Sequence, residues 1–250
     1  MKPQGYQLPL GTNVLRVKSC MLTTGNSEIE IIYQRGPYTI RKNCLMQLLE
    51  AILQPHAFDY LRTKEQLSYS VGVAADKYAD ILGFDIYVSS QEDKNSCDKV
   101  SAKIENFMNE VANKVIEELT DEDFENFKHA RVSVLHSDDL DIDNEIYRNW
   151  NEIVNNDFMF NRVEVVSDVT KTLTKLELQE FFKSFTQPEN MRRLNVQISG
   201  NYASPANDSE DKIFELIPTK LTEDEHLITN IEEFQKNLIL YPVVDTSIEN

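Results

Sequence analysis

The sequence predicts an α+β fold, an antiparallel sheet with helices packed on one of its faces. Glycine (7) and proline (8) are scarce among the 250 residues, so the many tight turns of a sandwich or barrel are not available. No proline lies between Pro55 and Pro188, and no glycine between Gly83 and Gly200, which favours long helices there. The predicted elements follow the order β, α, ββ, several helices, β, as in α+β proteins. No segment has the composition of a linker, so we predict one domain over residues 1–250.

The first half of the chain changes period several times. Residues 1–25 look irregular, and residues 28–34 then alternate apolar and polar side chains like a strand with one buried face. Residues 41–53 carry apolar side chains at helical spacing, and Pro55 should end that helix. A short helix around residues 58–61 should follow.

A hairpin and a long helix come next. Residues 68–88 alternate on both sides of a turn at residues 76–80, which predicts an antiparallel hairpin. An apolar stripe over residues 100–115 predicts a long helix.

Three threonines mark helix starts in the second half. Thr120, Thr174 and Thr222 each precede an acidic residue by three positions, the pattern of a capping box. Between the first two boxes, a further helix should turn Ile142, Ile146, Trp150 and Ile153 inward. Residues 194–198 alternate as a last strand, and residues 201–220 are polar enough to form a long loop.

The charge limits the partners of the chain. Lys and Arg number 25 against 42 Asp and Glu, a formal charge of −17, which repels phosphate and argues against nucleic acid and anionic membranes. A basic peptide or protein surface suits it better. We find no signal peptide and no apolar run of membrane-spanning length. Three widely spaced cysteines indicate a reducing compartment, so we expect a cytoplasmic protein.

No metal site is predicted in this chain. Its four histidines form neither H-E-x-x-H nor H-x-x-E-H. Asp139, Asp141 and Asp143 begin like a calcium loop, but Asn144 replaces the required glycine and Trp150 the required glutamate. These acids should instead form a solvated loop whose last members cap a helix.

Polar residues concentrate where the second predicted helix passes into the hairpin, over residues 58–69. The residues alone leave two interpretations open. Arg62 and Tyr69 could be a solvated helix cation and a core strand residue, or side chains from two elements that converge on one site.

Residues 61–69 resemble the Leu-Arg-Thr-Lys-Glu-Gln-Leu-Gly-Tyr motif of the insulysin and nardilysin family of zinc metallopeptidases. Further segments resemble the same family in the same order, so the resemblance covers about residues 8–244. These segments are residues 28–34, 147–153, 160–162, 171–174 and 234–243.

The resemblance implies the last of four homologous domains, in an enzyme whose two halves close around a chamber. The zinc motif H-x-x-E-H belongs to the first domain in this family, so zinc would lie in the parent's N-terminal half and this chain would need no cofactor. Its partners would be that half and peptide substrates, with a homodimer of the full enzyme possible. By resemblance, Arg62 and Tyr69 are catalytic and substrate-binding residues that reach the substrate carbonyl.

Two departures from the family pattern bear on function. Ser68 stands where the family usually has glycine, which affects how closely backbone and substrate approach. Residues 134–141 are acidic where the family carries basic residues, so polyphosphate should not bind there. We therefore expect a chamber-forming, substrate-binding domain of a peptidase that is inactive alone. The alternative is a non-catalytic scaffolding or peptide-binding subunit of the same fold.

Overall fold

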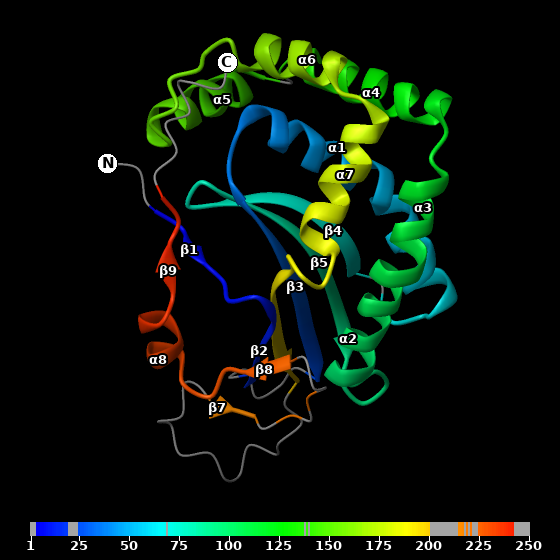
Figure 1. The fold of residues 1–250 in the computed structure, drawn as a ribbon, viewed down its shortest axis with the longest axis vertical. Coiled ribbons are helices and arrows are strands. Elements are labelled where there is room, and N and C mark those ends of the chain that lie inside the picture. The colour runs from blue at the N-terminus through cyan, green and yellow to red at the C-terminus, as the bar shows by residue number, and fades with distance from the viewer. Residues whose placement is uncertain are drawn as a thin grey trace.

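The computed structural model describes residues 4–19, 25–68, 70–137, 139, 141–200, 215–217, 219, 221 and 225–242, and their arrangement is α+β as predicted (Figure 1). Two of the helical segments, η1 and η2, are π-helical. The elements in chain order are β1 (Tyr6–Gln7), β2 (Gly11–Lys18), β3 (Asn26–Pro37), α1 (Ile40–Ala57), η1 (Phe58–Lys64), β4 (Ser70–Tyr78), β5 (Ile81–Gln91), α2 (Cys97–Asn106), η2 (Phe107–Ala112), α3 (Asn113–Glu118), α4 (Asp121–Leu135), α5 (Ile142–Val154), α6 (Arg162–Thr172), α7 (Lys175–Thr186), β6 (Arg192–Ser199), β7 (Glu215–Leu216), β8 (Glu225–Leu227), α8 (Ile231–Lys236) and β9 (Ile239–Leu240).

The main sheet is antiparallel over most of its width and mixed at one side. Its strand order is β4-β5-β3-β6-β2-β7, with β8 also paired to β2. Neighbours from β4 to β6 are antiparallel, whereas β2 runs parallel to β6 and to β8. Sequence periodicity did not reveal β2, which falls in the stretch that looks irregular. Its side chains are buried or half-buried on both faces, so they do not alternate.

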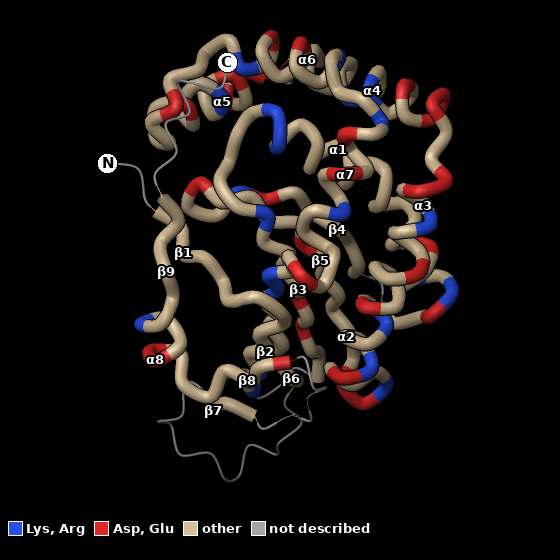
Figure 2. The backbone as a smooth tube through the Cα atoms, in the orientation of Figure 1, with Lys and Arg blue, Asp and Glu red and all other residues tan. Residues whose placement is uncertain are grey.

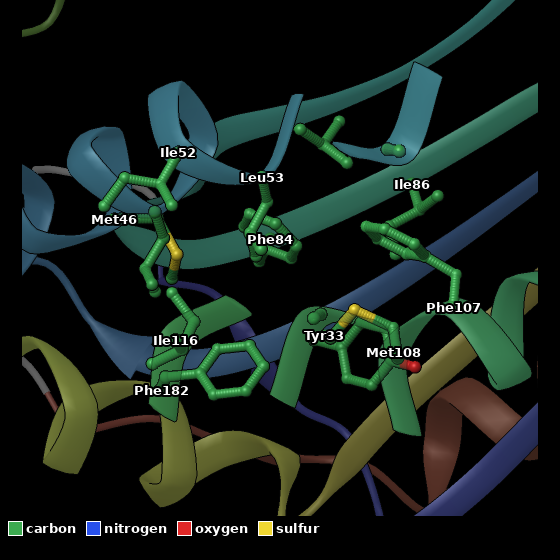
Figure 3. Packing of buried hydrophobic residues seen from close by; sticks show 14 of the residues in the cluster. Tyr33, Met46, Ile52, Leu53, Phe84, Ile86, Phe107, Met108, Ile116 and Phe182 are labelled. Carbon is green, nitrogen blue, oxygen red and sulfur yellow. The ribbon is translucent and has the colours of Figure 1, made fainter. Parts of the chain in front are cut away.

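Helices α1, α2 and α7 cover one face of this sheet and share a core with it (Figure 3). Strands β3 and β5 turn apolar side chains towards the helices at every second position, among them Tyr33, Phe84 and Ile86. Phe185 of α7 packs against several aromatic rings, with its centroid 6.2 Å from that of Phe84. The alternation predicted for residues 28–34 is therefore the packing face of β3.

Polar residues also lie under the helices, on β6. Asn195 and Gln197 are 0 % and 3 % exposed, whereas their apolar neighbour Ile198 is 38 % exposed. Asn195 Nδ2 donates to Ser101 Oγ of α2 over 2.7 Å, and Arg193 of β6 pairs with Glu105 of the same helix. These bonds compensate the burial of the polar groups, which would otherwise cost free energy.

Helix α1 continues through Pro55. The prediction that Pro55 ends this helix is wrong, because the chain stays helical to Ala57 and then runs on as the π-helical segment η1. Pro55 has no N–H to donate to the helix. The Phe58 N–H points at the carbonyls of Gln54 and Pro55, so the backbone hydrogen bonds of the helix resume after the proline. The short helix predicted around residues 58–61 is this extension, and such π-helical turns are frequent at functional sites.

The acidic residues lie mainly on the helices. Figure 2 shows Asp and Glu along α3 and α4, with fewer Lys and Arg among them. Asp141 caps α5, since its Oδ1 accepts from Asn144 N over 2.8 Å, which confirms that the acids before this helix serve as a cap. Across the described ranges, no helix combines the length and the apolar character that crossing a membrane requires.

Candidate functional site

A groove of about 980 Å³ lies where η1 passes into β4, beside the end of β5. It contains hydroxyl, amide and cationic side chains together with a few apolar ones. Its lining residues are Asn26, Phe58, Arg62, Thr63, Gln66, Leu67, Ser68, Ser70, Ser89, Ser90, Gln91, Lys94 and Asn95. The groove thus forms at the junction where the sequence concentrates polar residues. Arg62 lies in its first wall, which comes from η1 and the turn into β4.

Arg62 is oriented by an aromatic ring on its own helical segment. Its guanidinium carbon lies 4.4 Å from the ring centroid of Phe58, four residues earlier. Phe58 is 37 % exposed and Arg62 is half-buried. The N–H donors of a guanidinium lie in the plane of the group, so a ring that holds this plane also restricts the directions in which the group can donate. Arg62 can therefore donate hydrogen bonds into the groove from a restricted orientation.

The segment after Arg62 is tied to its surroundings through the backbone. Leu67 N donates to Leu61 O over 3.0 Å, and Asn95 Nδ2 donates to Leu67 O over 3.0 Å. Gln66 has a φ of 54°, a left-handed conformation uncommon for non-glycine residues. These contacts fix the turn from the helical segment into the strand. The groove residues Gln66 and Leu67 lie on this turn, so their positions are fixed as well.

Ser68 joins this turn to β5. Its hydroxyl donates to Ser89 O and accepts from Ser70 N, the latter over 3.0 Å. A glycine, which the motif that residues 61–69 resemble has at this position, would make neither bond. The serine therefore strengthens the hairpin at the groove and places a side chain beside the backbone.

Tyr69 lies outside the described residues. Its neighbours Ser68 and Ser70 both line the groove. The pairing of Arg62 with Tyr69 in one site stays a prediction.

The second wall of the groove was not found from the sequence. It comes from the end of β5 and the turn after it, and includes Asn95. Asn95 is 8 % exposed, and its side chain also accepts from Lys99 Nζ over 2.7 Å. The hairpin register, which pairs Ser70 with Ser89, could have placed this wall opposite the motif. No local signal marks Asn95.

Among the described residues, no three His, Cys, Asp or Glu side chains are grouped so that they could hold a metal ion. His136, the one histidine with a close polar contact in that part of the chain, has its Nε2 3.0 Å from Ser167 Oγ. The side chains that the structure describes therefore do not fit a zinc centre.

Comparisons with known proteins agree with the fold and with the motif. Residues 48–150, which include Arg62 and most of the groove, match the family described as PQQ synthase PqqF-like, C-terminal lobe domain 4. Nardilysin of Mus musculus is 30 % identical over 252 residues, which cover 96 % of this chain and 22 % of nardilysin. Insulin-degrading enzyme of Homo sapiens is 27 % identical over 233 residues, 89 % of this chain and 22 % of that enzyme.

A solved structure shows the same fold. The crystal structure of pitrilysin matches with a TM-score of 0.71 at 17 % identity, over 95 % of this chain and 24 % of the pitrilysin chain. The chain thus spans about a fifth of the length of the relatives it matches. Because the family match, the relatives and the fold agree, the chain belongs to the insulysin and nardilysin family and corresponds to its C-terminal lobe.

Proposed function

We propose that this chain is the substrate-binding and chamber-forming C-terminal domain of a zinc metalloendopeptidase, and that a peptide substrate lies against the groove beside Arg62. The observation that carries the proposal is the stacked Arg62 guanidinium on the wall of a polar groove. Hydroxyl and amide groups on both walls suit the carbonyl and N–H groups of an extended peptide.

Arg62 has the chemistry for this role. Its planar guanidinium stays charged and can donate to a substrate carbonyl both before and during the reaction. Negative charge develops on that oxygen when the carbonyl is attacked, so an oriented donor contributes more in the transition state. Tyr69 would add a phenol donor, as the family motif implies.

The rest of the catalytic machinery would lie elsewhere in the parent protein. By resemblance, the zinc ligands belong to the N-terminal half, and the described residues of this chain do not replace them. The N-terminal half is accordingly the proposed partner, and this domain alone should not hydrolyse peptides.

A scaffolding or peptide-binding role is the second candidate. It is favoured by the serine at position 68, where the family motif has glycine. Such a subunit would bind peptides or a partner protein without cleaving them.

The test is steady-state peptide cleavage by the full-length parent carrying Arg62→Ala. Lys64→Ala is the matched control, because Lys64 lies on the same helical segment, is exposed, pairs with Asp59 over 2.9 Å and does not line the groove. We expect kcat/KM to fall roughly 10²-fold for Arg62→Ala and to stay unchanged for Lys64→Ala. Equal activity of the two variants at matched melting temperatures would remove Arg62 from the proposal. A parent that binds peptides but never cleaves them would support the scaffolding role.

A further inference from the structure

A second pocket, of about 550 Å³, lies where β3 leads into the start of α1, with α7 along its other side. We call it the Arg35 pocket, and its charged lining residues are Arg35, Arg41, Lys42, Glu177 and Glu180. It shares no lining residue with the groove beside Arg62. The groove follows the far end of α1, which has 18 residues and is therefore about 27 Å long, so the two sites are separate.

Arg35 reaches this pocket from an irregularity in β3. The register of β3 against β5 shifts between Gln34 and Gly36, so Arg35 is the extra residue of a bulge. Gly36 has a φ of 108°, a backbone conformation that favours glycine. Bulges are common beside functional sites, where they redirect a side chain. The side chain at this bulge is a cation that lines a pocket.

The guanidinium of Arg35 is held in place without an acid beside it. Its carbon lies 5.0 Å from the ring centroid of Phe181 on α7, and its Nε is a buried atom without a hydrogen-bond partner in the described chain. Burial lowers the pKa of Arg35, Tyr241 opposes this effect, and no carboxylate among the described residues contributes. A half-buried cation without a counter-charge costs free energy, which a bound anion would offset.

The remaining charges leave an excess of positive charge in the pocket. Arg41 is neutralised by Glu177, since two of its guanidinium nitrogens donate to that carboxylate, with Nη2 2.7 Å from Oε2. Lys42 is a second cation and is half-buried, whereas Glu180, the other acid of the lining, is exposed. The first turn of α1 contains no acidic residue that would compensate the positive end of the helix dipole.

The lining also restricts the kind of anion that fits. The planar fork of an arginine binds a carboxylate through two parallel N–H donors. A singly charged carboxylate is favoured over phosphate, because Glu180 and the net charge of −17 repel a second negative charge. Leu45 and Phe181 add apolar surface to the same pocket. The fitting ligand is thus a carboxylate next to a small apolar group.

We propose that the Arg35 pocket binds a compact ligand that presents one carboxylate to Arg35 and Lys42 and an apolar group to Leu45 and Phe181. The last residue of a peptide and a free branched carboxylic acid both have this chemistry. The proposal does not depend on the proposed function, because the pocket uses none of the groove residues.

The test is ligand-detected saturation-transfer NMR on the chain with N-acetyl-leucine as the probe. This probe carries a carboxylate next to an isobutyl group, and N-acetyl-leucinamide has the same shape without the charge. We expect N-acetyl-leucine to bind saturably and the amide to bind at least about tenfold more weakly, because it cannot accept charge-assisted hydrogen bonds. Isocaproate, which lacks the amide group, separates the two sources. Tighter binding of N-acetyl-leucine supports a peptide end as the ligand, and equal binding supports a free carboxylic acid.

Substitutions of arginine make the test specific. Arg35→Met retains the length of the side chain and should lower the affinity at least about tenfold, whereas Arg35→Lys retains the charge without the fork and should lower it several-fold. Arg148→Met is the matched control and should bind like the parent, because Arg148 pairs with Asp139 and does not line the pocket. Arg35→Met removes a cation without a counter-charge, so its melting temperature without ligand should be no lower than that of the parent.

Several results would overturn the proposal. One is equal binding of N-acetyl-leucine by Arg35→Met and the parent, and another is equal binding of the acid and the amide. A lack of saturable binding by either carboxylate would do the same. Inorganic phosphate that binds more tightly than N-acetyl-leucine, and depends on Arg35, would exclude a carboxylate as the preferred ligand. If Arg35→Met does not fold, Arg35→Lys decides the matter, and parental affinity of Arg35→Lys would then overturn the proposal.

Discussion

Arg162 of α6 donates from two guanidinium nitrogens to the carboxylate of Glu152 on α5, with Nη2 2.9 Å from Oε2. The same nitrogen reaches Asp157 Oδ2 at 2.8 Å, and Nη1 donates to Tyr38 OH at 3.1 Å. Burial alone would raise the pKa of Glu152, but the hydrogen bonds from Arg162 and Met159 N lower it. The Glu152 carboxylate is therefore charged in the folded protein, and Arg162 fastens α5, the following turn and the core together.

Arg162→Met should destabilise the domain by about 3 kcal/mol, since it leaves a nearly buried carboxylate without its cation. Arg148→Met is the control, because the Arg148–Asp139 pair is exposed and its loss should cost no more than about 1 kcal/mol. Urea unfolding followed by circular dichroism measures both. The double variant Arg162→Met with Glu152→Gln should recover part of the loss, and a loss no greater than that of Arg148→Met would contradict the assignment.

Stability should fall as the pH rises from about 4 to 7, because of Asp85 on β5. Burial raises the pKa of Asp85 from 3.8 to about 7, while the hydrogen bond from Tyr78 lowers it and the charges of Glu30 and Asp76 raise it. Its Oδ1 is a buried atom without a hydrogen-bond partner in the part of the chain described. Between these pH values the folded state retains a proton that the unfolded state has lost, so ionisation favours unfolding.

Asp85→Asn should remove this pH dependence. The variant should gain stability relative to the parent across that pH window, by at most about 4 kcal/mol at pH 8. Asp93→Asn, at an exposed aspartate, should not. Unfolding free energies at pH 4.5 and pH 8 decide the matter, and identical pH profiles for Asp85→Asn and the parent would refute it.

Gln54 protects the edge of the main sheet. The strand β4 is the edge strand, and its Val73 N–H donates to Gln54 Oε1 of α1 over 2.7 Å. Gln54→Ala should cost about 1–2 kcal/mol and promote aggregation, because an edge N–H loses its acceptor. Gln54→Glu keeps an acceptor and should behave like the parent. Light scattering on heating compares them, and equal aggregation of all three proteins would contradict the prediction.

Ser68 should contribute to stability through its hydroxyl. Ser68→Gly removes the bonds to Ser89 O and Ser70 N, and we expect a loss of about 1–2 kcal/mol. Ser68→Ala isolates the hydroxyl from the added flexibility of glycine. Thermal melting of both variants gives the two contributions, and parental melting for Ser68→Ala would show that the hydroxyl adds nothing.

The purified chain should hold no stoichiometric zinc after dialysis. Three of its histidines lie on separate elements, His56 on α1, His129 on α4 and His226 on β8, so they do not present an open three-ligand site. Metal analysis by mass spectrometry is the measurement. One zinc per chain, lost on substitution of a histidine, would refute the prediction.

Local patterns in the sequence determined the α+β fold class and most of the helices of this protein. Thr120 and Thr174 are N-caps as predicted, with Oγ1 accepting from Asp123 N and Glu177 N at 3.0 and 3.3 Å, whereas Thr222 lies outside the described residues. Caps, and periods of two or 3.6 residues, depend on neighbours within a few positions, which a sequence displays directly. The motif around Arg62 was found in the same way.

Tertiary contacts decided the rest. The parallel pairing of β2 with β6, the burial of Asn195 and the wall at Asn95 each depend on partners far along the chain. Helix α5 shows the reason most clearly. Its periodicity identifies the apolar side made by Ile142, Ile146, Trp150 and Ile153, which the sequence predicts to face inward. That prediction is wrong, because these side chains are 72 %, 55 %, 55 % and 43 % exposed, and the side that faces the domain is set by the buried contact between Glu152 and Arg162.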